Sequence, residues 1–256
     1  MIHPSAVIHP DAKVDPSVEV GPFAVIDGGV ELGPENRVGP HTHLTGATRI
    51  GRGNIFHSGA VIGDAPQDLK YSGAPTQLTI GDENVFREHV TVHRSTTTDG
   101  KTAIGSNNFF MANSHVGHNC HLGDRVIIAN GALLGGHVIV EDNVFISGNC
   151  LAHQFVRIGT LALMQGGSAI SKDLPPYTVA RGDNGICGLN IIGLRRAQLT
   201  SQQRIELKRL YQLLFRGKRK LKDALTEASR DYTSSTARVM LEFIAASTRG
   251  VCADHG

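Results

Sequence analysis

The feature that most constrains the fold is an apolar residue at every sixth position from Ile2 to Ile170. A large apolar side chain occupies 25 of 29 such positions, and the phase breaks at Asp68 and Ala74 and slips at Thr98. An amphipathic helix repeats every 3.6 residues and a half-buried strand every two, so neither gives this spacing. Period six predicts a short strand and a turn in each hexad. Three hexads then close a triangular coil of about 18 residues, with the apolar position pointing inward.

The composition agrees with a narrow prism, because Gly is 30 of 256 residues and Trp is absent. The residue after the inward position is often Gly, Asp or Asn, as at Asp27, Gly33 and Gly105. We expect such residues to tolerate the tight corners of the triangle. The pattern resembles the hexapeptide-repeat acyltransferases, whose coils form a left-handed parallel β-helix, and the expected handedness comes from that resemblance alone.

The repeat ends at Asp173–Tyr177, and a helical pattern follows from residue 200. The expected fold is mainly β, with a left-handed parallel β-helix followed by a C-terminal α-helical domain. The predicted units are a β-helix domain at 1–180 with loops at 64–79 and 94–103, and a helical domain at 181–256 with helices from Thr200 or Ser201 to Arg216, over Lys222–Ser229 and over Thr236–Thr248. Thr200 or Ser201 at the start and Gly217 at the end of the first helix are residue types that cap helices.

Charge is distributed unevenly between the two predicted domains. The first, 1–180, carries 11 basic and 16 acidic residues, whereas 181–256 carries 14 basic and 7 acidic residues. A basic helical region is either a solvated face or a surface for phosphates or an acidic protein. Aromatic residues do not interleave with its charges, which argues against nucleic acid as a partner.

Three further features bear on location. No apolar run is long enough to cross a bilayer, and the start of the chain lacks the basic and apolar regions of a signal peptide, so no stable membrane insertion is expected. The four cysteines show no CxxC spacing. Free thiols are the default in a chain of this kind, and the expected location is the cytoplasm.

Histidines are concentrated in one stretch. Five of the 13 fall between positions 115 and 153, namely His115, His118, His121, His137 and His153. Positions three hexads apart should stack, which places His118 under Gly136 and Gly136 under Gln154. This column has three interpretations: histidines that are solvated or satisfied locally, a metal site, or a general base with polar neighbours that position a substrate.

The column is accompanied by two other motifs, Gln67–Tyr71 and Asn190–Arg196, and by the closing Ser247–Gly250. Taken together, in this order and spacing, they resemble the UDP-N-acetylglucosamine O-acyltransferases, which perform the first step of lipid A biosynthesis. The resemblance covers nearly the whole chain. It implies an acyl carrier protein thioester as donor, a UDP-sugar as acceptor, no cofactor, no metal and a homotrimer with clefts between adjacent prisms.

The resemblance also implies roles for individual residues. His118 matches a general base that takes the proton from the sugar 3-hydroxyl, and Gly136 matches a glycine whose backbone N–H faces the developing oxyanion. Gly166 matches a position that limits acyl length. The implied substrate-binding residues are Asp68, Lys70, His115 and His137 toward the sugar, and His153, Gln154, Asn190 and Arg196 toward the nucleotide and donor.

The sequence departs from this family at three positions. Asn119 follows the matched base where the family has an aspartate that orients the imidazole, Ile192 replaces a frequent glutamate, and Gln165 replaces a small residue. An amine needs less help from a base than a hydroxyl does, so a 3-amino UDP-sugar is a second possible acceptor, which would give an amide. The residues also leave open the later N-acyltransferase of the same pathway, a zinc-dependent β-helical hydratase and a non-catalytic scaffold.

Overall fold

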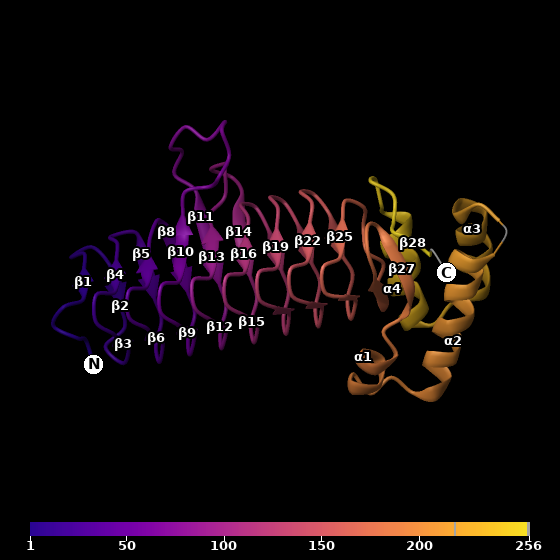
Figure 1. The fold of residues 1–256 in the computed structure, drawn as a ribbon, viewed down its shortest axis with the longest axis horizontal. Coiled ribbons are helices and arrows are strands. Elements are labelled where there is room, and N and C mark those ends of the chain that lie inside the picture. Colours follow the sequence, from indigo (N-terminus) through magenta and orange to yellow (C-terminus); the bar gives the residue numbers. More distant parts are fainter. Residues whose placement is uncertain (218, 255–256) are drawn as a thin grey trace.

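The computed structural model describes residues 1–217 and 219–254, so Lys218 and the last two residues of the expected 181–256 domain lie outside the described residues. The chain forms three long parallel sheets followed by helices (Figure 1). Neighbouring strands within a sheet mostly pair three hexads apart, as Val7 with Val25 and His115 with Leu133. The predicted β-helix with a C-terminal helical region is therefore confirmed.

The strands are two to five residues long. The first sheet contains β1 (Val7–Ile8), β4 (Val25–Ile26), β7 (His43–Leu44), β10 (Val61–Asp64), β13 (Thr91–His93), β16 (His115–Val116), β19 (Leu133–Leu134), β22 (Leu151–Ala152) and β25 (Ala169–Ile170). The second contains β2 (Lys13–Val14), β5 (Val30–Leu32), β8 (Ala47–Ile50), β11 (Gln77–Ile80), β14 (Lys101–Ile104), β17 (His121–Leu122), β20 (Ile139–Val140) and β23 (Arg157–Ile158). The third contains β3 (Glu19–Val20), β6 (Arg37–Val38), β9 (Ile55–Phe56), β12 (Val85–Phe86), β15 (Phe109–Phe110), β18 (Ile127–Ile128), β21 (Phe145–Ile146), β24 (Leu163–Met164), β26 (Thr178–Ala180), β27 (Gly185–Leu189) and β28 (Ala253–Asp254).

The inward position of each hexad forms the core. Phe56, Phe86 and Phe110 are fully buried and stack with ring centroids 4.9 and 4.6 Å apart. Coils on either side place Val, Ile, Leu or Met at the same position, as with Ile128 and Ile146. Removal of this continuous apolar column from water is the main driving force for stacking the coils.

The structure corrects the expected reason for glycine at the corners of the coils. The glycines that follow the inward position do not have a positive φ, with Gly63 as an exception. They are explained by close approach, because a Cβ on Gly33 would lie 2.7 Å from the carbonyl oxygen of Gly51 in the next coil. The left-handed conformation falls two residues later in the hexad, where Asn107 and Asn113 each have a φ of +60°. Asn tolerates that region better than most residues do, whereas His, Phe and Glu at equivalent positions are held there by the coil.

The chain leaves the coils in two places, between β10 and β11 and between β13 and β14. Figure 1 shows the first insertion protruding beyond the line of the coils. The base of this loop is fixed by Arg94, which donates to the carbonyl oxygen of Gly63 at 2.9 Å and to the hydroxyl of Tyr71 at 3.2 Å. The first insertion also lengthens the spacing between paired strands, so that Ile62 pairs with Val92, five hexads on rather than three.

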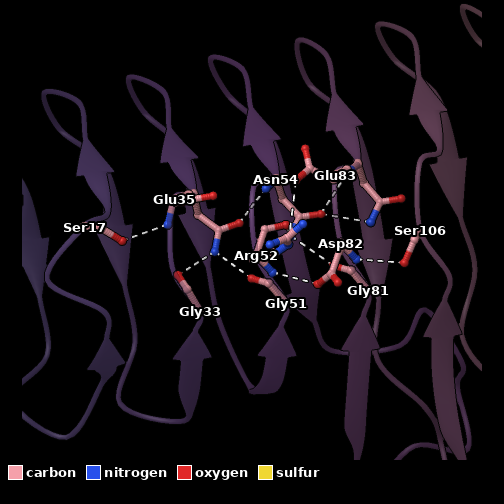
Figure 2. A network of polar contacts seen from close by, with 12 residues as sticks. Ser17, Gly33, Glu35, Gly51, Arg52, Asn54, Gly81, Asp82, Glu83 and Ser106 are labelled. Carbon is pink, nitrogen blue, oxygen red and sulfur yellow. Dashed lines mark hydrogen bonds and ion pairs between the residues drawn. The ribbon is translucent and has the colours of Figure 1, made fainter.

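At the corner between the second and third sheets, called here the closed corner, side chains of successive coils hydrogen-bond to one another's backbone (Figure 2). Asn54 is fully buried, donates to the carbonyls of Arg52 and Gly81, and accepts from Asn84. The backbone N–H of Arg52 donates to Asp82 Oδ1 at 2.8 Å, and that of Asp82 donates to Ser106 Oγ at 3.0 Å. Side chains of one coil thus take the backbone donors that the preceding coil leaves open.

The segment expected to be helical, 181–256, also contains strands. β27 and β28 extend the third sheet past residue 180, and strands this short leave no periodic signal in the sequence. The helices are α1 (Ile191–Arg196), α2 (Ser201–Tyr211), a π-helical turn (Gln212–Arg216), α3 (Leu221–Asp231) and α4 (Ser235–Ala245). Thr200 caps α2 in a capping box with Gln203, which confirms the expected start. In the described part of the chain, no helix combines the length and apolarity needed to cross a membrane.

Candidate active site

The predicted stacking of His118 and Gly136 is observed at the corner between the first and second sheets. The backbone N–H of His137 donates to the carbonyl oxygen of His118 at 2.8 Å, which fixes one turn upon the other. A Cβ on Gly136 would lie 2.4 Å from Cε1 and 2.6 Å from Nε2 of His118. The glycine therefore lets the imidazole lie directly against the backbone of the next coil. His118, Gly136 and Gln154 are called here the His118 corner.

Gly136 also has a free backbone donor. The backbone N–H of the first residue of such a turn donates to no backbone carbonyl. Proline, which has no N–H, can therefore occupy this position, as it does at Pro10, Pro22 and Pro34. In the closed corner a side chain of the next coil takes this N–H, but in residues 1–217 and 219–254 no group accepts the N–H of Gly136. An unused donor beside an imidazole is suited to binding a developing negative charge.

Two grooves meet near this corner. The first, the His118 groove, has a volume of about 700 Å³. Its lining includes Gln67, His93, His115, His118, Leu133, Gly136, Leu151, His153 and Gln154. The second, the Arg157 groove, has a volume of about 600 Å³ and is lined by Lys101, Asn119, His121, His137, Phe155, Arg157 and Arg249, among others. One groove combines apolar side chains with histidines, and the other is rich in cationic groups.

His115 lies within the His118 groove in its neutral form. Its Nδ1 is 2.7 Å from the hydroxyl of Thr91. Burial, with smaller contributions from His93 and His118, lowers the pKa of His115 to about 4. His93 packs edge-on against it at 4.8 Å, is 5% exposed, and burial lowers its pKa as well. The sequence prediction does not include His93, because the inserted loops hide its place in the same sheet.

Asn119 follows the imidazole in the turn and is buried. Its φ is +60°, a conformation that Asn tolerates. Its Oδ1 lies 2.9 Å from Nδ1 of His118, so the contact that an aspartate would make is made by an amide. His137 lies on the other side, 5.3 Å from the His118 ring and stacked at 4.5 Å on Phe155.

The loop after β10 brings Asp68 toward this corner. Burial and then His118 lower the pKa of His137, and the charge of Asp68 opposes them. Asp68 Oδ1 also accepts from the backbone N–H of Lys70 at 2.9 Å, and Lys70 is exposed and lines neither groove. Gln67, from the same motif, lines the His118 groove.

Three predicted residues are not brought to this corner within one chain. Asn190 caps α1, donating to the carbonyl of Leu161 and accepting from Gly193, and it lines neither groove. Arg196 is exposed at the end of α1, which lies in Figure 1 on the opposite side of the coils from the protruding loop. Gly166 is exposed at the corner between the third and first sheets. A Cβ there would meet only Gly148 O, at an ordinary 3.6 Å, so packing of this chain does not require glycine.

The metal interpretation has no support within a single chain. Across residues 1–217 and 219–254, no group of three His, Cys, Asp or Glu side chains is placed to hold a metal ion. The four cysteines are free, and three of them are buried.

Comparison with known proteins gives a consistent result. Residues 173–252 match the family model for UDP N-acetylglucosamine O-acyltransferase, domain 2, and residues 101–136 match the bacterial transferase hexapeptide model. The acyl-[acyl-carrier-protein]–UDP-N-acetylglucosamine O-acyltransferases of Herminiimonas arsenicoxydans and Thermodesulfovibrio yellowstonii are 42% and 41% identical, each with 98% of both chains covered.

Solved structures agree with the sequence comparison. The UDP-N-acetylglucosamine acyltransferase of Francisella novicida superposes with a TM-score of 0.95 at 33% identity, covering 100% of this chain and 95% of that one. That of Campylobacter jejuni gives 0.93 at 32% identity, with 99% of both chains covered.

Proposed function

The chain belongs to the acyl-[acyl-carrier-protein]–UDP-N-acetylglucosamine O-acyltransferases of lipid A biosynthesis, and from that premise we propose a residue-level mechanism. His118 is the general base, and Gly136 supplies the oxyanion donor. The observation that carries this proposal is the His118 ring, which lies against the Gly136 residue at the edge of a groove, in a turn whose Gly136 N–H is free.

The reaction begins when Nε2 of His118 takes the proton of the sugar 3-hydroxyl as that oxygen attacks the thioester carbonyl. A C–O bond forms, and the carbonyl oxygen becomes an oxyanion within reach of the Gly136 N–H. Collapse of this intermediate breaks the C–S bond, and the protonated imidazole returns its proton to the departing thiolate of the carrier. The acyl chain is then an ester on the sugar, and the base is regenerated.

The remaining residues in and near the two grooves bind and position the substrates. Asp68, Lys70, His115 and His137 position the sugar, and the neutral form of His115 suits it to hydrogen bonding rather than charge pairing. His153 and Gln154 lie farther along the His118 groove, toward the nucleotide and donor. The basic 181–256 region faces the acidic acyl carrier protein.

The site is completed in a homotrimer. Asn190 and Arg196 reach the nucleotide from an adjacent subunit, since α1 lies away from the His118 groove of its own chain. Subunit mixing tests this: inactive His118→Ala and weakened Arg196→Ala chains, refolded together, should regain activity above that of either homotrimer. Recovery equal to the simple average of the two would contradict a shared site.

The proposed domains of the chain are 1–180 and 181–256. The proposed location is the cytoplasm, where free cysteines are usual.

Gly166 limits acyl length, because a side chain at this exposed corner would occupy room that the end of a long acyl chain needs. Gly166→Ala should favour acyl chains shorter by one or two carbons, with a change in selectivity of roughly tenfold per methylene. The matched control is Gly148→Ala, one coil away, where a Cβ would meet only Asn130 O at 3.4 Å. Mass spectrometry of products from a panel of acyl carrier thioesters measures both, and unchanged selectivity in Gly166→Ala would remove the role.

One observation favours a second acceptor, a 3-amino UDP-sugar. Asn119 gives the imidazole no charge partner, and an amine needs less help from the base. Assaying the protein against the 3-hydroxyl and 3-amino sugar nucleotides decides between them. An ester as the favoured product supports the O-acyltransferase, a strong preference for the amide supports the amine acceptor, and no transfer to either would overturn the mechanism.

A further inference from the structure

A chain of directed hydrogen bonds surrounds the Asn119 amide. Its Oδ1 accepts from the backbone N–H of Thr96 at 3.1 Å and from the Thr96 hydroxyl at 2.9 Å. Its Nδ2 lies 2.9 Å from Oγ of Ser95, a fully buried side chain whose hydroxyl donates to the carbonyl of Thr97 at 3.0 Å. Both partners come from the loop between β13 and β14, which this network ties to the His118 corner.

The two ends of this chain fix its direction. The backbone N–H of Thr96 can only donate, so the atom that faces it must be the amide oxygen. The carbonyl of Thr97 can only accept, so the Ser95 hydroxyl donates to it and accepts from Nδ2 of Asn119. The Asn119 oxygen then faces Nδ1 of His118 at 2.9 Å, and only a protonated Nδ1 can complete that contact as a hydrogen bond.

We propose that Ser95 and Thr96 are positioning residues that hold the Asn119 amide in one orientation and thereby keep the His118 proton on Nδ1, leaving Nε2 unprotonated toward the groove. The catalytic consequence rests on the proposed function, in which Nε2 is the base. The tautomer itself does not depend on that function, because it is a property of the free protein.

The substitution of an amide for a carboxylate explains why such positioning matters. A carboxylate accepts through either oxygen, so it orients an imidazole whichever way it is turned. An amide accepts only on one side, and a flipped Asn119 would present its NH₂ to Nδ1 and favour the other tautomer. That tautomer has its proton on Nε2 and cannot take one from the acceptor. The loop therefore supplies a directionality that a carboxylate would not need.

The direct test is ¹⁵N NMR of the His118 ring in the full-length protein, with the signals assigned by their loss in His118→Gln. We expect a protonated Nδ1 and an unprotonated Nε2 in the neutral ring. The double variant Ser95→Ala, Thr96→Val keeps the backbone N–H of Thr96 and removes both hydroxyls. It should show a mixture of tautomers, with kcat lower by on the order of tenfold and KM little changed.

Rescue separates positioning from a general loosening of the loop. Adding Asn119→Asp to the double variant should restore a single Nδ1–H tautomer and most of the lost kcat, and should move the acid limb of the rate profile to higher pH. Thr42→Val is the matched control, because Thr42 is a buried threonine whose hydroxyl donates to the carbonyl of His57 in a distant coil.

The outcomes are distinct. An Nε2–H tautomer in the unaltered protein overturns the proposal, as does a double variant with unchanged tautomer and kcat, or one that Asn119→Asp fails to rescue. If the double variant does not fold, the single Ser95→Ala variant and the spectrum of the unaltered protein still decide it. The expected tautomers in a protein that transfers no acyl chain would instead count against the proposed function alone.

Discussion

The closed corner and the His118 corner belong to the same hexad repeat. They differ in whether a side chain accepts the backbone N–H of the first residue of the turn. In the closed corner, side chains of several coils accept the backbone donors of the coil before, as Asp82 does for the N–H of Arg52 (Figure 2). In the His118 corner, Gly136 leaves its N–H open, and the imidazole of His118 occupies the space that a Gly136 side chain would fill. The same backbone thus forms a scaffold where side chains bind its open donors, and a candidate reactive site where an imidazole lies beside a residue with an open donor.

The comparison is tested most severely by removing the imidazole. His118→Ala should lower kcat/KM by about 10³-fold, because the variant loses the side chain that takes the acceptor proton. The thermal midpoint should change little, since the ring lines a groove and makes few core contacts. The matched control is His9→Ala, which removes an exposed histidine that lines neither groove. Near-normal turnover in His118→Ala would end the assignment of the base.

The second test adds a methyl group at the His118 corner. Gly136→Ala should lower kcat by about 10²–10³-fold, because the new Cβ would lie 2.4 Å from Cε1 of His118 and must displace the ring from its place beside Gly136. KM for the sugar nucleotide should change less. Gly148→Ala again serves as control. If Gly136→Ala retains full kcat, the close approach of ring and backbone has no catalytic meaning.

The third test removes a buried amide from the closed corner. Asn54→Ala removes donors to Arg52 and Gly81 and an acceptor for Asn84, which leaves several buried groups unpaired. The free energy of unfolding should fall by about 3 kcal/mol. The kcat of the folded protein should stay unchanged, because this corner forms no part of either groove. Urea denaturation and steady-state kinetics measure the two effects, and a large loss of kcat would contradict the separation of scaffold and site.

The sequence predicts the coils well and their corners less well. The inward residues repeat every six positions, so the strands and the stacking of His118 under Gly136 follow from arithmetic. The left-handed turn position carries no such signal, because Asn, His, Phe and Glu all occupy it. His93 is hidden because its strand pairs with β16 at a spacing of four hexads instead of three, as Thr91 with His115.

Other parts of the site depend on contacts that no spacing reveals. The family resemblance matches Asn190 to a nucleotide-binding position, and its side chain also caps α1 within its own chain, through one donor and one acceptor of the amide. The directed network from Ser95 and Thr96 to Asn119 crosses an inserted loop, where the period of six is lost. Periodicity therefore locates residues that share a sheet, whereas loops and interfaces need coordinates.

The smallest effect expected is a pH dependence of the free energy of unfolding, which arises near the His118 groove and not at the closed corner. Asn54 does not titrate, but His115 is buried neutral with a pKa of about 4, below its ordinary value of 6.5. Between these values the unfolded chain binds a proton that the folded protein does not, so the free energy of unfolding falls as the pH drops from 6.5 toward 4. His115 alone should account for about 2 kcal/mol between pH 7 and pH 5. Urea denaturation at both pH values should show this loss in the unaltered protein and a smaller one in His115→Gln, with His121→Gln as the exposed control; equal losses in all three would mean that His115 is not held neutral by burial.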